Sequence, residues 1–428
     1  MNYEETIQYL YAALPVFHRI GKAAYKANMD NAIILDNHFN NPHTNYKTIH
    51  VAGTNGKGSV SHILASVLQT AGYKTGLYTS PHLFNFRERI RINGNMISEQ
   101  LVIDFVAENR QLIEQLKPSF FEITSAMAFY LFAKENVDIA VIETGLGGRL
   151  DSTNIISPEI SVITNIGLDH TEFLGNTLAD IAKEKAGIIK PHTPVVIGEK
   201  HAETTNVLKQ IAESRNAPLY FAEECFEIVS AKKREGKQIF DINHLNKLPS
   251  ENMTISIDLE GNYQQKNVIT AISALAILKK NLAISSNAIG EGLSNTALNT
   301  NLQGRWQILK TQPLVIADTG HNAHGLAYTM KQLEETNHEN MYIVFGVAED
   351  KDIDSIVPFL PKTAYYYFTN AAISRAMKAE QLAQICVAAG LKGEIVNSVK
   401  EAVKKAIDKA TANDVVFIGG STFVVAEI

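Results

Sequence analysis

Residues 48–59, Thr-Ile-His-Val-Ala-Gly-Thr-Asn-Gly-Lys-Gly-Ser, decide how this chain folds. Their first five residues form an apolar run that is typical of a buried strand. The glycines that follow allow backbone N–H groups to approach an anion closely, and Lys57 adds a cation that can reach the terminal phosphates of a nucleotide. The pattern departs from the standard G-x-x-x-x-G-K-[ST] loop, because Gly58 lies between Lys57 and Ser59. We therefore predict an irregular phosphate-binding loop, with an ordinary glycine-rich turn as the alternative.

The residues after this loop favour phosphate binding. Apolar residues recur at helical spacing from 62 to 68, and Gly72 then stops the pattern. The strand, loop and helix that such a motif requires are thus present in order. The Ser59 hydroxyl is a candidate ligand for the magnesium ion that accompanies a nucleotide.

Composition narrows the class of protein. The chain has 428 residues, enough for two or three domains, and 45% hydrophobic and 20% charged residues are ordinary for a soluble globular enzyme. The net charge of −6 argues against a nucleic-acid partner. The chain has neither a signal-like N-terminus nor about 18 consecutive apolar residues, so we expect no membrane partner. Cys225 and Cys386 lack metal-ligand spacing, which favours a reducing cytoplasm, and we expect a monomer.

The order of apolar segments predicts an α/β fold. Strand candidates alternate with helical patterns between residues 48 and 198, which is typical of a mostly parallel sheet covered by helices. Residues 226–259 indicate a small antiparallel appendage, and residues 265–280 indicate a helix. The polar segment 294–303 is interpreted as a linker. The strand candidates are 74–79, 137–142, 160–164 and 194–197, and then 314–317, 341–345, 364–368 and 415–418.

These patterns predict two domains. We expect a phosphate-loop domain with a mostly parallel sheet over residues 1–298, and a smaller Rossmann-like α/β domain over residues 299–428. Helices are expected in the second domain around residues 326, 353, 379 and 402.

Polar residues that follow the apolar runs are candidates for chemistry, because ligands gather beyond the carboxyl ends of parallel strands. Glu143 precedes a glycine-rich loop, where its carboxylate suits a magnesium ion; a surface carboxylate is the alternative. His170 is either a metal ligand or a structural histidine. Ser80 either offers its hydroxyl to the same metal or forms a Ser-Pro turn. Lys185, taken alone, is a cation at the end of a helix with no special role.

Two residues of the second domain are also candidates. Arg305, at the domain junction, either reaches phosphates to stabilise transferred charge or is an interdomain salt-bridge partner. Asp318 follows the strand candidate 314–317, where its carboxylate can accept hydrogen bonds from a ribose.

These candidates lie in a series of motifs that runs in order along the chain, at residues 50–59, 80–83, 88–90, 143–154, 168–171, 184–187, 304–305, 318–322 and 350–352. The series resembles the folylpolyglutamate synthase and dihydrofolate synthase family, a branch of the Mur-type ATP-dependent amide ligases. In two places the chain departs from the family. The family often has Asp-Gly-Ala-His-Asn where this chain has Thr319 and Gly320 between Asp318 and His321, and residues 346–350 lack a basic residue common there. Neither departure removes a predicted ligand.

The resemblance implies an ATP site and a pair of magnesium ions. Lys185 is similar to a family lysine that becomes carbamylated, which turns a cation into an anionic oxygen ligand. The resemblance therefore replaces the interpretation of Lys185 as a helix-end cation with no special role. The implied ATP positions are Thr54, Asn55, Gly56, Lys57, Gly58, Ser59, Asn267 for the adenine, Arg305 and Asp318. The implied metal positions are Ser80, Glu143, His170 and Lys185. The implied catalytic positions are Lys57, Lys185, Arg305 and His321.

The resemblance also implies a pterin site in the first domain and a glutamate-ligase role for the second. The Phe121 ring suits a flat heterocycle by stacking, although an aromatic residue beside a helix start is usually part of the core. The implied substrate positions are Ser119, Phe121, Glu122, Leu150, Asp151 and Ser152.

We therefore expect an ATP-dependent amide ligase that adds L-glutamate to dihydropteroate, to the γ-carboxylate of a folate, or to both, through an acyl phosphate. Two other functions stay open. One is a cell-wall Mur-type amino-acid ligase, which residues 80–83 disfavour. The other is a nucleotide-dependent switch that hydrolyses ATP without forming an amide.

Overall fold

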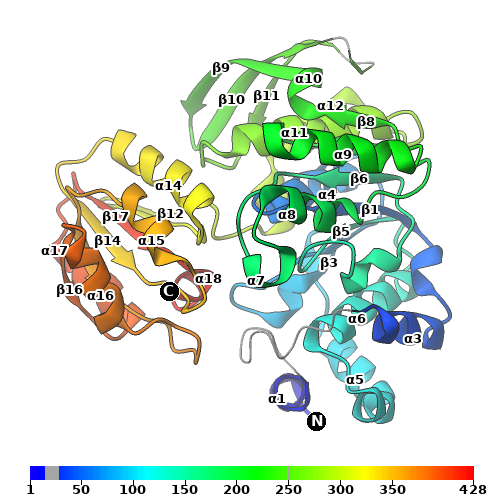
Figure 1. Cartoon of the computed structure of the whole chain (residues 1–428), viewed down its shortest axis with the longest axis horizontal. Coiled ribbons are helices and arrows are strands. Elements are labelled where there is room, and N and C mark those ends of the chain that lie inside the picture. Colours follow the sequence, from blue (N-terminus) through cyan, green and yellow to red (C-terminus); the bar gives the residue numbers. More distant parts are fainter. Residues whose placement is uncertain (15–27, 246, 249–250) are drawn as a thin grey trace. The chain divides into compact units, whose positions relative to one another are not determined.

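The computed structural model describes residues 1–14, 28–245, 247–248 and 251–428 (Figure 1). The chain divides into two compact units. Unit 1 comprises Met1–Asp258 and Gln264–Leu302, and unit 2 comprises Leu259–Tyr263 and Gln303–Ile428. No helix among the described residues is long and apolar enough to cross a bilayer.

Unit 1 is built on an eight-stranded sheet within its described residues. Its strands are β1 (Lys47–Ala52), β2 (Thr75–Tyr78), β3 (Ile90–Ile92), β4 (Asn95–Met96), β5 (Ile139–Glu143), β6 (Ile160–Ile163), β7 (Val195–Ile197) and β8 (Leu219–Phe221). Their order is β4-β3-β2-β5-β1-β6-β7-β8, and only β3 and β4 are antiparallel to their neighbours. The predicted parallel sheet is confirmed.

Helices cover both faces of this sheet, so that its central strands are buried (Figure 1). One core cluster joins β2 and β5 to α1 (Tyr3–Ala13), α5 (Glu99–Leu116) and α6 (Phe120–Lys134), and another joins β6 and β7 to α8 (Leu178–Ala186) and α9 (Ala202–Ser214). The other helical segments of unit 1 are α3 (Asp30–His38), η2 (Pro42–Thr44), α4 (Lys57–Thr70), η3 (Phe86–Arg89), η4 (Ser152–Ile155), α7 (Thr171–Leu174), α10 (Ala222–Cys225), α11 (Gln264–Leu278), α12 (Ser286–Ser294) and α13 (Thr296–Thr300).

A second, three-stranded sheet lies in unit 1. It consists of β9 (Phe226–Arg234), β10 (Lys237–His244) and β11 (Met253–Ile257), paired antiparallel in the order β11-β10-β9. This sheet confirms the predicted antiparallel appendage, and α11 confirms the helix predicted after it.

The linker predicted at residues 294–303 is wrong. This segment contains α13, which packs against α4 in unit 1. Its Thr296 and Thr300 side chains are fully buried, and the Thr300 hydroxyl lies 2.8 Å from Nδ1 of His62. A helix whose polar side chains are hydrogen-bonded inside the fold has the same composition as a solvated linker. The composition of this segment therefore could not distinguish the two. The domain boundary predicted after residue 298 falls within this helix.

Unit 2 has a six-stranded sheet in the order β12-β13-β17-β14-β15-β16 within its described residues. Its strands are β12 (Gln307–Thr311), β13 (Leu314–Ala317), β14 (Met341–Phe345), β15 (Tyr365–Phe368), β16 (Lys392–Ile395) and β17 (Val415–Gly419). All neighbours are parallel except β12, so the predicted second α/β fold is confirmed. Its helical segments are α14 (Ala323–Glu335), α15 (Ile353–Ile356), η5 (Val357–Phe359), α16 (Ala379–Ala388), α17 (Val399–Lys409) and α18 (Thr422–Val425).

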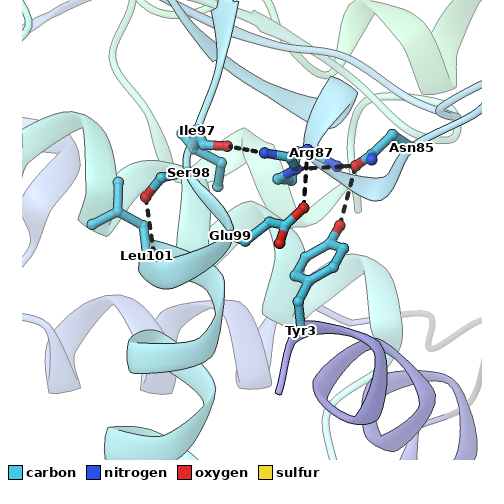
Figure 2. A network of polar contacts seen from close by, with 7 residues as sticks. All are labelled: Tyr3, Asn85, Arg87, Ile97, Ser98, Glu99 and Leu101. Carbon is cyan, nitrogen blue, oxygen red and sulfur yellow. Dashed lines mark hydrogen bonds and ion pairs between the residues drawn. The ribbon is translucent and has the colours of Figure 1, made fainter. Parts of the chain in front are cut away.

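A polar network ties α1 to the segment that follows β2 (Figure 2). The Tyr3 hydroxyl donates a hydrogen bond to Oδ1 of Asn85 at 3.1 Å, and the Arg87 guanidinium lies 5.5 Å from the Tyr3 ring centre. Arg87 also pairs with Glu99, at the start of α5, at 3.3 Å, and donates to the Ile97 carbonyl at 3.4 Å. The segment that leads away from Ser80 is therefore held by two helices.

Candidate active site

The predicted phosphate loop lies between β1 and the N-terminus of α4. Two of its glycines are required by their surroundings. Gly53 has a φ of 152°, and a Cβ there would lie 1.8 Å from Oγ1 of Thr164. Gly56, with a φ of 82°, would bring a Cβ to 2.3 Å from Oδ1 of Asn267. Because α4 is 14 residues long and starts at Lys57, backbone N–H groups and the positive end of the helix dipole face the loop.

Lys57 and Lys185 meet at this loop. The Lys57 ammonium donates to the carbonyls of Gly53 at 3.0 Å and Thr54 at 3.2 Å, and the Lys185 Nζ donates to the same Gly53 carbonyl at 2.8 Å. Lys185 is in the last turn of α8 but is only 4% exposed. Burial, reinforced by the charge of Lys57, lowers the pKa of Lys185 to about 7. A large fraction of this amine is therefore neutral near neutral pH.

Ser80 and Glu143 also lie together. β2 and β5 are parallel neighbours, so the residues after each strand reach the same edge of the sheet. The Ser80 backbone N–H donates to Oε2 of Glu143 at 3.1 Å, and Glu143 is 4% exposed. His170 directly precedes α7, and its backbone N–H donates to Oδ1 of Asp169 at 2.9 Å. A buried carboxylate beside a serine offers the oxygen ligands that magnesium prefers.

The described residues contain no group of three or more His, Cys, Asp or Glu side chains that could hold a metal ion. The predicted metal set has only two such residues, Glu143 and His170, so a complete ligand shell needs oxygens from elsewhere. The phosphates of a bound nucleotide are a suitable source.

The segment after Ser80 contains residues to which the sequence assigned no role. Arg89 is 2% exposed, donates from Nε to Nδ1 of His82 at 2.8 Å, and lies 5.2 Å from the Phe120 ring centre. The carboxylate of Glu88 accepts backbone hydrogen bonds from Leu83, Phe84 and Asn85. Both residues lie in the matched segment 88–90, which was the available signal.

Two predicted substrate residues have a structural role at the start of α6. Ser119 is the N-cap, and its hydroxyl accepts from the Glu122 backbone N–H at 3.2 Å, while the Glu122 carboxylate accepts from the Ser119 N–H at 2.5 Å. This is a capping box, which the Ser-x-x-Glu spacing signals in the sequence. The Phe121 ring packs against Gly145, where a Cβ would lie 2.4 Å from it. α6 thus meets the glycine-rich loop that follows Glu143.

Asp151 organises that glycine-rich loop. Its Oδ2 accepts from the backbone N–H groups of Gly145 and Leu146, both at 2.9 Å. Its Oδ1 accepts from the N–H and the hydroxyl of Thr153, at 3.0 and 2.5 Å. Since the single Thr153 hydroxyl proton is used there, Nε2 of the buried His50, at 2.9 Å, must donate to Thr153. Two of these four contacts shape the glycine-rich loop, and the other two hold Thr153 in η4.

His50 is expected to make the fold sensitive to acid. Burial lowers its pKa from 6.5 to about 3. Between about pH 3 and pH 6.5, the His50 imidazole binds a proton in the unfolded chain but not in the folded chain. The free energy of unfolding therefore falls as the pH falls below 6.5. We expect a loss of about 2 kcal/mol from His50 between about pH 8 and pH 5, measured by urea unfolding. His50→Gln should lose less between the same pH values, and an equal loss in both proteins would contradict this role.

Glu122 and Ser152 are among the residues that line one small pocket, together with two polar residues that the sequence analysis did not single out. The unpredicted residues are Asp36, on α3, and Ser125, whose hydroxyl lies 2.8 Å from that of Ser152. Leu150 is half-buried. Of the predicted substrate residues, Glu122 and Ser152 therefore meet at one cavity. α3 and α6 are distant in sequence, so no local pattern placed Asp36 there.

In unit 2, Asp318 and Arg305 lie beside the same loop. The Asp318 Oδ2 accepts from the Trp306 N–H at 2.7 Å and from the Tyr263 hydroxyl at 2.6 Å. Arg305 donates to the hydroxyl of Thr319 and to the Gly304 carbonyl. Thr319, one of the two residues at which this loop differs from the family pattern, therefore accepts a hydrogen bond from Arg305.

His321 belongs to the same loop of unit 2. Its Nδ1 lies 3.0 Å from the Thr319 carbonyl. Burial and the adjacent Asp318 raise the pKa of Tyr263, so its hydroxyl stays a donor. Arg305, Asp318 and His321 are therefore neighbours within unit 2.

The chain is similar to known proteins over nearly all of its length. Residues 51–275 match the Mur ligase middle domain, and residues 304–422 match the Mur ligase glutamate ligase domain. The dihydrofolate synthase/folylpolyglutamate synthase of Bacillus subtilis is 35% identical over 401 residues, which cover 90% of each chain. The chain spans only about half the length of two archaeal relatives, 50% and 46%, which are named probable bifunctional folylpolyglutamate synthase/dihydropteroate synthases.

The chain is also similar to solved structures of proteins with these names. Escherichia coli FolC in complex with DHPP and ADP has a TM-score of 0.86 and 28% identity, over 100% of this chain and 96% of that chain. A bifunctional folylpolyglutamate synthase/dihydrofolate synthase with Mn, AMPPNP and L-glutamate bound has a TM-score of 0.83 and 27% identity, over 100% of this chain and 97% of that chain.

Proposed function

We infer the activity of this chain from the family to which it belongs: it is a member of the Mur ligase family, in the branch of the dihydrofolate and folylpolyglutamate synthases. It is an ATP-dependent ligase that joins L-glutamate to a pterin substrate through an amide bond. The resemblance seen in the sequence is confirmed. The observation that carries the proposal is the phosphate loop at the start of α4, with Lys57 and the buried Lys185 on one loop carbonyl.

The reaction proceeds in two steps. A substrate carboxylate oxygen attacks the γ-phosphorus of ATP, which forms an acyl phosphate and releases ADP. The amine of glutamate then attacks the acyl carbon, loses a proton, and expels phosphate from the tetrahedral intermediate. The amide bond of the product is the bond that forms, and the acyl–phosphate bond is the one that breaks.

We assign the phosphates of ATP to residues 54–59, whose helix N-terminus and Lys57 attract negative charge. Asn267 is assigned to the adenine, and its amide lies directly against Gly56 of the loop. Arg305 and Asp318 of unit 2 are assigned to the transferred phosphate and the ribose, and His321 to the same group of catalytic residues. Arg305 and His321 are both hydrogen-bonded to Thr319, the residue that follows Asp318, and this proximity within unit 2 supports the assignment.

A divalent metal is proposed for the same site; one related structure was solved with Mn, AMPPNP and L-glutamate bound. Ser80 and Glu143 fit magnesium by their oxygen donors and their proximity, and His170 completes the proposed protein ligands. When bound, magnesium neutralises charge on the phosphoryl group being transferred.

The proposed carbamate forms on Lys185. Its lowered pKa, about 7, supplies the neutral amine that must attack CO2. The nitrogen–carbon bond forms and one amine proton is released, so the product is an anionic carbamate whose oxygens can serve the second magnesium ion.

The substrate is proposed to be dihydropteroate, a folate, or both. The contact of Phe121 with Gly145 places an aromatic ring beside the glycine-rich loop, which supports a site for a flat heterocycle there. Glu122 and Ser152, which line one small pocket, are assigned to the same site. Leu150 and Asp151 are assigned to the same site, Asp151 through the loop that it shapes.

Phosphate release is the test of this function. With ATP, magnesium and L-glutamate present, we expect release only when dihydropteroate or tetrahydrofolate is added. Release that ignores glutamate would favour a nucleotide-dependent switch, and release only with a nucleotide-sugar peptide would favour a cell-wall ligase. Gel filtration tests whether the chain is the monomer we expect.

A further inference from the structure

We infer that Asn165 is a positioning residue for the phosphate loop, and that Glu199 and Lys266 hold Asn165 in place. The three residues come from the end of β6, the end of β7 and the first turn of α11. This inference rests on one part of the proposed function, the binding of nucleotide phosphates by residues 54–59.

Asn165 fixes the backbone at the start of the loop. Its side-chain Oδ1 accepts a hydrogen bond from the Asn55 N–H at 2.8 Å, and its carbonyl accepts from the Thr54 N–H at 3.0 Å. The hydroxyl of the preceding residue, Thr164, donates to the Asn55 carbonyl at 2.5 Å. Both polar groups of the Asn55 peptide backbone therefore bond to two consecutive residues that follow β6. Asn165 is 5% exposed, so water does not compete strongly for these bonds.

Glu199 orients the Asn165 amide. The Nδ2 of Asn165 donates to Oε1 of Glu199 at 3.1 Å, while the Lys266 ammonium is bonded to Oε2 of the same carboxylate. Because Asn55 presents a donor and Glu199 an acceptor, only one orientation of the amide satisfies both. The bond to a carboxylate is charge-assisted, and the lysine keeps that carboxylate in place. The Glu199 side chain is 18% exposed, so solvent only partly screens the ion pair between Glu199 and Lys266.

α11 reaches the loop a second time through its first residues. Gln264 donates from Nε2 to the Ser59 hydroxyl at 3.2 Å and accepts from the Asn267 amide at 2.8 Å. Asn267, the proposed adenine contact, follows Lys266 directly in sequence. One helix is therefore bonded to both ends of the phosphate loop, at Ser59 directly and at Asn55 through Glu199 and Asn165.

The consequence concerns how Asn55 contributes to ATP binding. Its backbone N–H is already committed to Asn165, so phosphate oxygens would use the N–H groups of later loop residues and Lys57. A loop that is held in its binding shape before the nucleotide arrives loses less conformational entropy on binding. Weakening the Asn165 bonds should therefore reduce nucleotide affinity more than the rate of chemistry.

The test exchanges donor and acceptor between Asn165 and Glu199. Asn165→Asp places two carboxylates side by side and removes the donor, and we expect ADP with magnesium to bind about tenfold more weakly by titration calorimetry. Adding Glu199→Gln restores the hydrogen bond with its direction reversed, so the double variant should recover most of that affinity. In the phosphate-release assay, the KM for ATP should rise in Asn165→Asp while kcat changes less.

The matched control is Glu135→Gln, which removes an exposed carboxylate paired with Lys74 at 3.4 Å and should leave ADP affinity unchanged. Unchanged ADP affinity in Asn165→Asp, or a double variant as weak as the single one, would overturn the inference. If Asn165→Asp does not fold, Glu199→Gln alone should weaken ADP binding about threefold, and an unchanged affinity again overturns it. ADP binding needs no ligase activity, so wild-type protein that binds ADP but releases no glutamate-dependent phosphate refutes the proposed function alone.

Discussion

Lys57→Ala is expected to reduce kcat/KM for glutamate-dependent phosphate release by about a hundred- to a thousandfold. The Lys57 ammonium lies at the first residue of α4 and is hydrogen-bonded to two loop carbonyls. When ATP is bound, these donors can turn to phosphate oxygens, where negative charge moves during transfer. Alanine leaves the helix N-terminus intact but removes the cation. The loss should therefore be larger in kcat than in ADP affinity.

A matched lysine controls for a general loss of positive charge. Lys74 is 40% exposed and pairs with Glu135 at the surface of the same unit, so Lys74→Ala should keep wild-type turnover. Equal kcat/KM in Lys57→Ala and the wild type would remove Lys57 from the mechanism, whereas equal losses in both variants would point to electrostatics of the whole surface.

Replacing Lys185 is expected to have an effect of similar size. If its carbamate supplies a metal ligand, Lys185→Ala and Lys185→Arg should both lose about a hundredfold or more in kcat, because neither side chain can form the carbamate. The wild type should lose activity when CO2 is removed below pH 7 and regain it when bicarbonate is added at higher pH. The direction follows from the pKa of about 7, above which the amine is mainly neutral and can react.

Native mass spectrometry reads the modification directly. The wild type should gain the mass of one CO2 with bicarbonate and magnesium, and Lys185→Arg should not. Full activity of CO2-free enzyme, with no added mass, would contradict the carbamate. In that case the buried amine would act as a plain lysine beside the Gly53 carbonyl.

Local patterns predicted much of the fold because they are repeated along each element. Alternating apolar runs placed β2, β5, β6 and β7, and the strand, glycines and helix around Lys57 placed the phosphate loop. The pattern failed at α13, since buried threonines that bond to their own helix and to His62 look like a polar linker. β12 and β16 were not predicted, because both are short and mostly exposed, so no buried apolar run marks them in the sequence.

Only part of the candidate site could be predicted, because only local patterns can be read from the sequence. Residues 80, 143 and 185 could be named as candidates because each lies in a motif or at a strand end. The capping box of Ser119 and Glu122 was readable from its spacing but was given a substrate role alone. Asp36 and Arg89 were missed, since neither the cavity nor the burial of a cation is a property of neighbouring residues in sequence.

The sequence by itself therefore determined the phosphate loop, the alternation of strands and helices, and the family, all of which depend on residues within a few positions of each other. Tertiary structure alone decided that Lys57 and Lys185 share one carbonyl and that Asn55, Asn165, Glu199 and Lys266 form a chain of hydrogen bonds. The physical reason is that a hydrogen bond requires atoms about 3 Å apart, and residues from different strands reach that distance only when the sheet has brought their ends together.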